Sequence, residues 1–384
     1  MHRAHGRAVR QVAADSEAAD RRRAAGDTGE RREISRTGLA SRRHHASDHD
    51  DRPAGAALPL SGARAVPAFS PALGLLLLSA ASWAIYARIG EGFLSSFNLF
   101  TLSQLLAETA VIGAAQLVVV AIGQLNLAVG AVGAITVMST GWLAGPAGMP
   151  LVPALLIGVV EGAACGALMG WLERLTGLGS FIVTLAMASI YTGLVLIASG
   201  GAAVSALPQA LTDFGANPLV LQSLSWLVVP AAIVFGGLWI LYRRTRSGWQ
   251  MLAVGASERA ATLSGVPTGR VVVTTFALSG ALSAVAAIME MARVASALPS
   301  LGTDWLLLSF IVPVLGGTAL RGGAVALGGA LAATLFVVSI NSGLVSLGVN
   351  AYWQEFAQAV VLLLAILAER TARGARRGRA IHAG

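Results

Sequence analysis

The chain has 384 residues, of which 55% are hydrophobic and only 12% are charged. Soluble domains carry about 25% charged residues, so this composition argues against an ordinary soluble protein and indicates a membrane protein. All 27 basic residues are Arg, because the sequence contains no Lys. This absence excludes a phosphate-binding P-loop and Schiff-base lysine chemistry, both of which require a Lys side chain.

Residues 1–68 are rich in Arg, Ala and Asp and contain few large apolar side chains. We expect a disordered cytoplasmic tail, because such a composition buries too little apolar surface to fold. The segment lacks the basic start and the apolar run of 7–15 residues that mark a signal peptide. Two roles stay open for this tail, namely binding of anionic lipid through its arginines and a passive extension.

Ten apolar spans follow, and each is predicted to be a transmembrane helix. About 20 residues at a rise of 1.5 Å cross a hydrocarbon core of about 30 Å, and backbone groups inside lipid must be satisfied within the helix. We therefore predict an all-α polytopic membrane protein, with a permease domain over residues 69–370 and a basic cytoplasmic tail over 371–384. The spans lie near residues 70–87, 101–122, 126–144, 150–171, 180–199, 224–242, 271–291, 304–320, 323–342 and 353–369.

The arginines predict the orientation of the spans, because cytoplasmic loops carry an excess of basic residues. With the N-terminus in the cytoplasm and ten spans, only Arg88 and Arg293 fall outside. We therefore expect both termini in the cytoplasm, and the net charge of +8 does not indicate a nucleic-acid partner. The arginines that fall inside are Arg174, Arg243, Arg244, Arg246, Arg259, Arg270, Arg321 and the group at 370–379.

Small residues recur along the fourth span. Glycine lets membrane helices approach closely, so a stripe of glycines on one helix face predicts packing against another helix of the same chain. The single cysteine, Cys165, lies in the same apolar run and can form neither an internal disulfide nor a Cys-rich metal site. The stripe consists of Gly158, Gly162, Gly166 and Gly170.

The longest polar interruption of the apolar region is RRTRSGWQMLAVGASERAATLSGVPTGR, residues 243–270. Ser257 can cap the start of a helix, and Glu258 favours the positive end of its dipole. Gly265 can supply the left-handed residue that ends the helix, and Pro267 prevents its continuation. So short a helix is marginal in water, so it is either a docking element that needs a partner or a solvated connector. The predicted helix also contains Arg259, Ala260, Ala261 and Leu263.

Five segments of the chain resemble one protein family. The stretch AVGASERAATLSGV is similar to the cytoplasmic coupling loop of permease subunits in ribose-type ABC importers, within the wider branched-chain amino acid and sugar permease family. The other four resemble family motifs in the correct order and at the correct spacing, and together they cover most of the chain after residue 95. They are GQLNLAVGAVGAITV, SFIVTLAMASIYTGLVLIASGG, VPVLGGTALRGGAVALGGAL and GLVSLGVNAYWQEFAQAVVLLLAIL.

The resemblance implies a non-catalytic permease subunit in the bacterial inner membrane, which imports a monosaccharide or a similar small polar solute. It implies no cofactor in this chain, because ATP and Mg would be bound by a separate ABC-type ATPase. The coupling loop would dock into that ATPase, with Ala260 and Ala261 against the partner surface. Other implied partners are a periplasmic or extracellular solute-binding protein, a second permease chain, most simply forming a homodimer, and membrane lipid, with no nucleic acid.

The chain departs from the family pattern at three positions. The family Asp of the first motif is Asn126, the family Asn before Gly170 is Met169, and a second acid of the coupling loop is replaced by Arg259. The first two changes reduce charge or polarity along the expected pathway. A sugar specificity therefore does not carry over from the family.

Polar side chains within the spans are candidates for the solute pathway, because such groups are costly in a membrane and by default functional. Neutral amides and hydroxyls suit an uncharged, hydroxyl-rich solute, since they both donate and accept hydrogen bonds. The alternative is hydrogen bonding between helices, which contributes about 0.6 kcal/mol per bond. The candidates are Gln124 and Asn126 at a glycine-flanked helix break, together with Thr184, Ser189, Asn341 and Gln358.

Three acids lie within or near the spans, and two of them leave a second function open. Glu290 lies one turn from Arg293 near the outer end of its span, which predicts a surface ion pair. Glu108 and Glu161 lie deeper, so a proton-coupled secondary transporter that uses one of these acids stays open. An ion channel is disfavoured because no carbonyl filter or charged ring is present. An intramembrane enzyme or metal site is disfavoured because all six His lie outside the spans.

Overall fold

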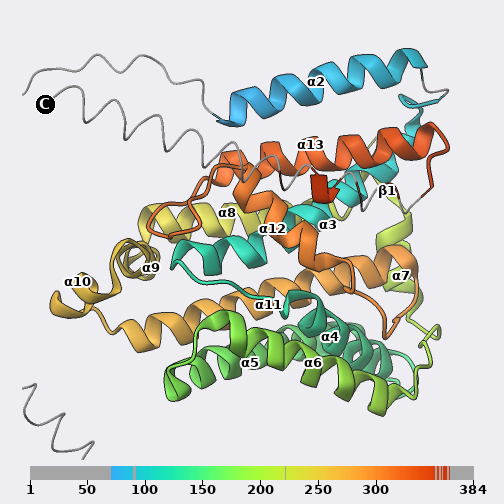
Figure 1. The fold of residues 1–384 in the computed structure, drawn as a ribbon. Helices are drawn as coiled ribbons and strands as arrows, with labels where there is room; N and C mark the ends of the chain where they lie inside the picture. Colours follow the sequence, from blue (N-terminus) through green and yellow to red (C-terminus); the bar gives the residue numbers. More distant parts are fainter. Residues whose placement is uncertain are drawn as a thin grey trace, which may run out of the picture. The chain divides into compact units, whose positions relative to one another are not determined.

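The computed structural model describes residues 71–89, 92–220 and 222–350, together with positions 353, 356, 358–360 and 363. The predicted tails, 1–68 and 371–384, lie outside these residues. The chain divides into two units at residue 66, and every described residue belongs to the second unit, 67–384. Helices predominate throughout this part of the chain (Figure 1).

Among the described residues, six helices are long and apolar enough to cross a membrane. They are α2 (Pro71–Ile89), α3 (Ser96–Ala121), α5 (Leu151–Thr176), α6 (Ser180–Ser199), α11 (Thr268–Val294) and α13 (Leu327–Ser346). Shorter helices are α4 (Val129–Ala144), α7 (Gln209–Ala216), α8 (Val228–Arg244), α9 (Arg246–Ala256), α10 (Glu258–Leu263) and α12 (Trp305–Leu315). An antiparallel hairpin pairs β1 (Pro218–Val220) with β2 (Leu224–Ser225).

These helices agree with a polytopic membrane protein, whereas the count of ten spans stays a prediction. The span expected near 224–242 begins as a helix only at Val228, because the β hairpin occupies the preceding residues. The span expected near 304–320 is helical for 11 residues, with Pro313 inside it and Gly316 at its end. Proline removes a helical hydrogen bond, which explains an early end. The span expected at 353–369 lies mostly outside the described residues.

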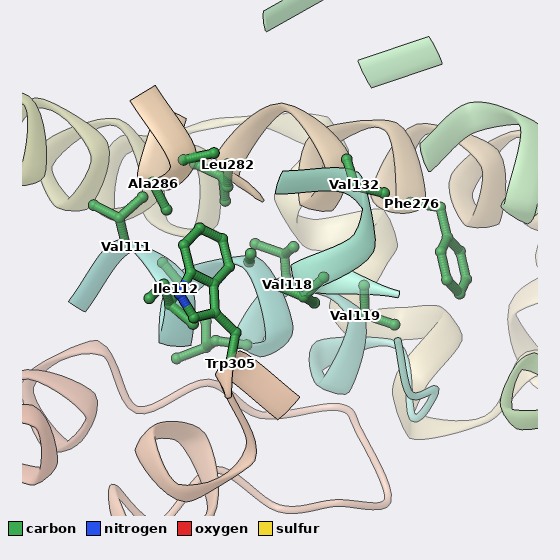
Figure 2. Close-up of a cluster of buried hydrophobic side chains, with 14 of the residues drawn as sticks. Val111, Ile112, Val118, Val119, Val132, Phe276, Leu282, Ala286 and Trp305 are labelled. Atoms are coloured by element: carbon green, nitrogen blue, oxygen red, sulfur yellow. The ribbon is translucent and has the colours of Figure 1, made fainter. Parts of the chain in front are cut away.

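Helix α3 is the centre of the core. Almost every side chain from Leu102 to Ala121 is buried, which is typical of a helix that contacts protein on all sides. Trp305 at the start of α12 is 1% exposed and belongs to the same cluster. Figure 2 shows this cluster, with side chains from α3, α4, α11 and α12 packed together.

Helix α5 packs along α11 through its stripe of glycines. A Cβ added at Gly162 would lie 2.6 Å from the carbonyl oxygen of Gly280, and one added at Gly170 would lie 2.9 Å from the Cα of Val273. One added at Gly166 would overlap the carbonyl oxygen of Phe276, and one added at Gly158 would instead overlap Thr140 of α4. The two backbones of α5 and α11 therefore approach each other more closely than any side chain at these positions would permit.

Candidate functional site

Residues 243–270 contain two short helices, α9 and α10, which meet at Ser257 between the end of α8 and the start of α11. The hydroxyl of Ser257 accepts a hydrogen bond from the backbone N–H of Ala260 at 3.3 Å, which caps α10. Gly265 has φ +80°, which glycine adopts without strain, and the N–H of Val266 donates to the carbonyl of Ala261 at 3.0 Å. The chain thus leaves α10 at the glycine expected from the sequence.

Helix α9 was not predicted. Thr245 caps it by accepting from the N–H of Gly248 at 3.1 Å, and its buried side chains include Met251 and Val254, three residues apart. A capping threonine followed by apolar residues at helical spacing is a usable signal for this helix. Figure 1 shows α9 and α10 together at one end of the helices, beside the turn that precedes α13.

Helix α10 is covered by its own chain on one side only, at Ala261, and its other residues are exposed. Ala261 is 5% exposed and packs into the main core with Val266, whereas Leu263 is 84% exposed. Arg259 and Ala260 are also exposed. The expectation that both alanines face a partner is therefore corrected for Ala261, because this small side chain holds α10 against its own chain.

The predicted helix break lies at residues 122–128, between α3 and α4. Asn126 is fully buried; its amide donates to the hydroxyl of Ser279 at 3.0 Å, and its Oδ1 accepts from the N–H of Ala128 at 2.9 Å. The N–H of Leu127 donates to the hydroxyl of Thr184 at 3.1 Å. Asn126 and Thr184 thus satisfy backbone and side-chain groups that the break leaves without helical partners.

Two further side chains at the break, Gln116 and Glu173, were missed by the sequence analysis. The side-chain amide of Gln116 lies against both backbone polar groups of Asn126. Gln124 donates from Nε2 to Oε1 of Glu173 at 2.5 Å. The rule that singles out polar residues in apolar spans would also have found Gln116, and Glu173 is one of a charged pair at the end of α5.

A polar cavity of about 230 Å³ lies between α3, α11, α12 and α13, and two predicted pathway residues, Asn341 and Gln358, line it. Among the described residues, Oδ1 of Asn341 is a buried acceptor without a hydrogen-bond partner. Asn341 therefore lines the cavity and carries a buried amide oxygen whose hydrogen-bonding capacity no protein group uses among the described residues. Its other polar lining residues are Asn98, Thr101, Glu108, Thr109, Glu290, Arg293, Asp304, Trp305 and Ser342.

Arg293 in this cavity binds an acid that the sequence analysis did not pair with it. Its Nε lies 2.8 Å from Oε2 of Glu108, whereas its Nη2 lies 3.7 Å from Glu290. Glu290 also accepts from the indole N–H of Trp305 at 3.1 Å. The expected surface pair of Glu290 and Arg293 is thus the longer part of a cluster in which the deeper Glu108 holds the arginine.

A second cavity of about 650 Å³ lies between α4, α5 and α6 and is lined mainly by apolar side chains. Glu161 lines it and accepts from the hydroxyl of Ser139. Tyr191 donates to the carbonyl of Cys165 at 2.9 Å.

Ser189 lies apart from both cavities, exposed on α6 and bonded to the carbonyl of Leu185 at 3.4 Å. The six pathway candidates therefore divide into three at the break, two in the polar cavity and one on the surface of α6.

Comparisons with known proteins agree with the resemblance. The family described as "Branched-chain amino acid transport system / permease component" matches residues 97–366. The ribose import permease protein RbsC of Escherichia coli (strain K12) is 32% identical over 291 residues, covering 74% of this chain and 89% of the relative. RbsC of Bacillus subtilis (strain 168) is 32% identical over 305 residues, covering 78% and 92%.

A third relative carries the name of another sugar. The L-arabinose ABC transporter permease protein AraH of Azospirillum brasilense is 29% identical over 305 residues, covering 79% of this chain and 89% of the relative. No solved structure matches the chain. The extent of the family match, over residues 97–366, shows that the chain belongs to the branched-chain amino acid transport system / permease component family, as an inner-membrane permease of the ribose type.

Proposed function

We propose that the chain forms the translocation pathway of an ATP-driven importer for a monosaccharide or a similar small polar solute, and that α10 couples it to a separate ATPase. The observation that carries this proposal is the exposed face of α10, formed by Arg259, Ala260 and Leu263. The relatives are named as permeases for ribose, L-arabinose and D-allose.

The face of α10 has the character of a protein contact. Leu263 exposes 84% of its surface on a helix of only six residues, which is capped by Ser257 and held at its opposite face by Ala261. An apolar side chain presented on a rigid, anchored element suits burial in the cleft of a partner. The absence of a P-loop Lys leaves ATP and Mg²⁺ to the partner ATPase, so the role of α10 is a mechanical connection.

The polar cavity is the best-supported contact region for the solute. Asn341 and Gln358 line it with neutral amides, and Asn341 has an unpartnered oxygen. We assign Asn126 and Thr184 to holding the break and Gln124 to its attachment, since each already has a protein partner, although Oε1 of Gln124 has none among the described residues. Ser189 stays a pathway candidate only through its exposed position on α6.

In this proposal, closure of the ATPase on ATP moves α10, and the pathway alternates between outward and inward access. A solute-binding protein outside the membrane delivers the solute. A two-fold ATPase offers two clefts while each chain has one α10, so the transporter contains two permease chains, most simply a homodimer with C₂ symmetry. Mass measurement of the intact complex checks this assembly, and one copy without a sister permease would contradict it.

The decisive experiment reconstitutes the complex, purified with its ATPase and solute-binding protein, into vesicles and measures uptake of radiolabelled ribose, arabinose and allose. We expect uptake only with ATP on the side of the ATPase, and no ATP hydrolysis by this chain alone. The alternative, a proton-coupled transporter that uses Glu108 or Glu161, predicts uptake driven by a proton gradient without ATPase. The bond between Glu108 and Arg293 disfavours this alternative for Glu108, because that acid already has a cationic partner, whereas Glu161 accepts from a hydroxyl.

A further inference from the structure

Three backbone segments meet at a junction next to α9 without side chains between them. At the end of α3, the carbonyl of Ala121 accepts a hydrogen bond from the N–H of Gly323 at 2.9 Å. A Cβ added at Gly322 would lie 2.9 Å from the Cα of Gly255, and one added at Gly123 would lie 2.7 Å from the carbonyl oxygen of Arg321. Gly255 of α9 thus lies directly against the end of α3 and against the turn between α12 and α13.

This junction, formed by Gly123, Gly255, Gly322 and Gly323, has little freedom to slide. A Cβ added at Gly255 would lie 3.0 Å from the carbonyl carbon of Ala121 and would overlap nearby backbone atoms. Because packed backbones transmit displacement rather than absorb it, a movement of α9 reaches the end of α3 directly. Gly123, with φ +76°, is the first residue past α3 at which the chain can change direction.

A second connection runs through the end of α5. Glu258, the first residue of α10, binds Arg174 with an Oε1–Nη1 distance of 2.5 Å. The neighbouring residue, Glu173, accepts from Gln124 in the break at 2.5 Å. Helix α10 is therefore connected to the break by side chains as well as by the backbone junction.

We propose that these two connections convert movement of α10 into movement of the break, so that residues 122–128 are the inner gate of the pathway and Gly255 and Arg174 are its positioning residues. The break suits this role because the N–H groups of Leu125 and Leu127 are held by hydroxyls of α6 rather than by helical carbonyls. Such bonds can be exchanged without unwinding a helix. The inference rests on the proposed function, which supplies the movement of α10.

The first test separates coupling from transport with Gly255→Ala, which wedges α9 away from the break. Its matched control is Gly236→Ala in α8, where an added Cβ meets no atom within 4 Å. In vesicles containing the whole complex, we expect Gly255→Ala to lower the solute imported per ATP hydrolysed by about two- to thirtyfold, the usual range for a coupling contact. The ATPase should remain bound, and Gly236→Ala should match the wild type.

Arg174 gives an independent test, because it acts through an ion pair rather than through the backbone junction. Its ion pair is half-exposed, with side-chain exposures of 38% and 50%, so Arg174→Ala should lower coupling by only about two- to fivefold. Arg174→Lys should retain coupling, and the swap Arg174→Glu with Glu258→Arg should restore it. Rescue by the swap would show that the ion pair itself carries the effect, and an unchanged melting temperature of Arg174→Ala would separate lost coupling from lost stability.

The gate itself is followed with Leu125→Cys in a Cys165→Ala background, labelled by a maleimide with and without ATP. We expect ATP to change the labelling rate, and Gly255→Ala to abolish that change. If Gly255→Ala does not fold, the Arg174 variants test the connection between α10 and the break. ATP-dependent uptake combined with unchanged coupling and labelling in these variants would overturn this inference alone. A wild-type complex without ATP-dependent uptake would instead overturn the proposed function.

Discussion

Arg293 of α11 binds Glu108 of α3 across the polar cavity, with 2.8 Å between Nε and Oε2 and only 7% of the glutamate side chain exposed. The pair joins two of the most deeply buried helices of the chain, at positions 185 residues apart in the sequence. A carboxylate held by an arginine in this way is less available as a carrier of protons than an unpaired one. This ion pair therefore disfavours Glu108 as a proton-coupling acid, and the alternative function then depends on Glu161, which accepts from a hydroxyl.

Glu108→Gln is therefore expected to affect stability more than energy coupling. Removing one partner of a buried ion pair costs about 3–5 kcal/mol, and we expect the lower end because Glu290 remains 3.7 Å from the arginine. Thermal unfolding in detergent measures the loss, with Glu161→Gln as the control, since Glu161 accepts from a hydroxyl rather than from an arginine. Loss of proton-driven uptake in either variant would instead favour the secondary transporter.

The exposed face of α10 predicts how the ATPase is held. Leu263→Ala should weaken association with the ATPase by about tenfold or more, because burying a leucine side chain contributes about 1.5–3 kcal/mol. Arg259→Ala should be milder, as a rim charge contributes about 0.2–1 kcal/mol. Co-purification of the ATPase at increasing dilution gives both values. Equal retention of the ATPase by wild type and Leu263→Ala would make residues 243–270 a connector.

Ala261 is the matched contrast on the same helix. Ala261→Glu should also reduce ATPase association, but by placing a charge in the core of its own chain, since the side chain is 5% exposed. This variant is therefore expected to increase proteolysis within residues 243–270 before any ATPase is added, whereas Leu263→Ala is not. Identical proteolysis of Ala261→Glu and the wild type would show that Ala261 does not anchor the helix.

The glycine stripe predicts a stability effect with a clear control. Gly166→Ala places a methyl group against the carbonyl of Phe276, and overpacking of this kind costs about 1–3 kcal/mol. Gly193→Ala on α6 meets no atom within 4 Å and should be neutral or slightly stabilising. The melting temperatures of the two purified variants test this prediction. Equal values would mean that α5 and α11 move apart at Gly166 without loss of stability.

Asn341 tests the polar cavity as the solute site. Asn341→Leu removes the unpartnered buried oxygen, so stability should be unchanged or higher, while the KM for uptake should rise by about two- to tenfold through loss of one hydrogen bond. Ser189→Ala is the control, because that hydroxyl bonds only to its own helix among the described residues. A KM that rises for Ser189→Ala but not for Asn341→Leu would move the pathway to the exposed face of α6.

Local features of this protein could be read from the sequence. The low content of charged residues indicated a membrane protein, and Ser257 and Gly265 bounded α10 because caps and left-handed glycines act within one or two turns. The break before α4 was marked by Gly123 and by polar residues in an apolar region. Each of these signals depends on neighbouring residues alone.

Only the tertiary structure decided which groups meet. The sequence paired Arg293 with its neighbour Glu290, whereas the fold brings Glu108 closer. The sequence analysis placed Ala261 against a partner protein, whereas the fold buries that side chain in the core of its own chain. It contained no sign that Gly255 lies between the end of α3 and the turn before α13. Contacts between distant segments depend on how helices pack, and the periodicity of a single apolar helix does not specify which neighbour covers each face.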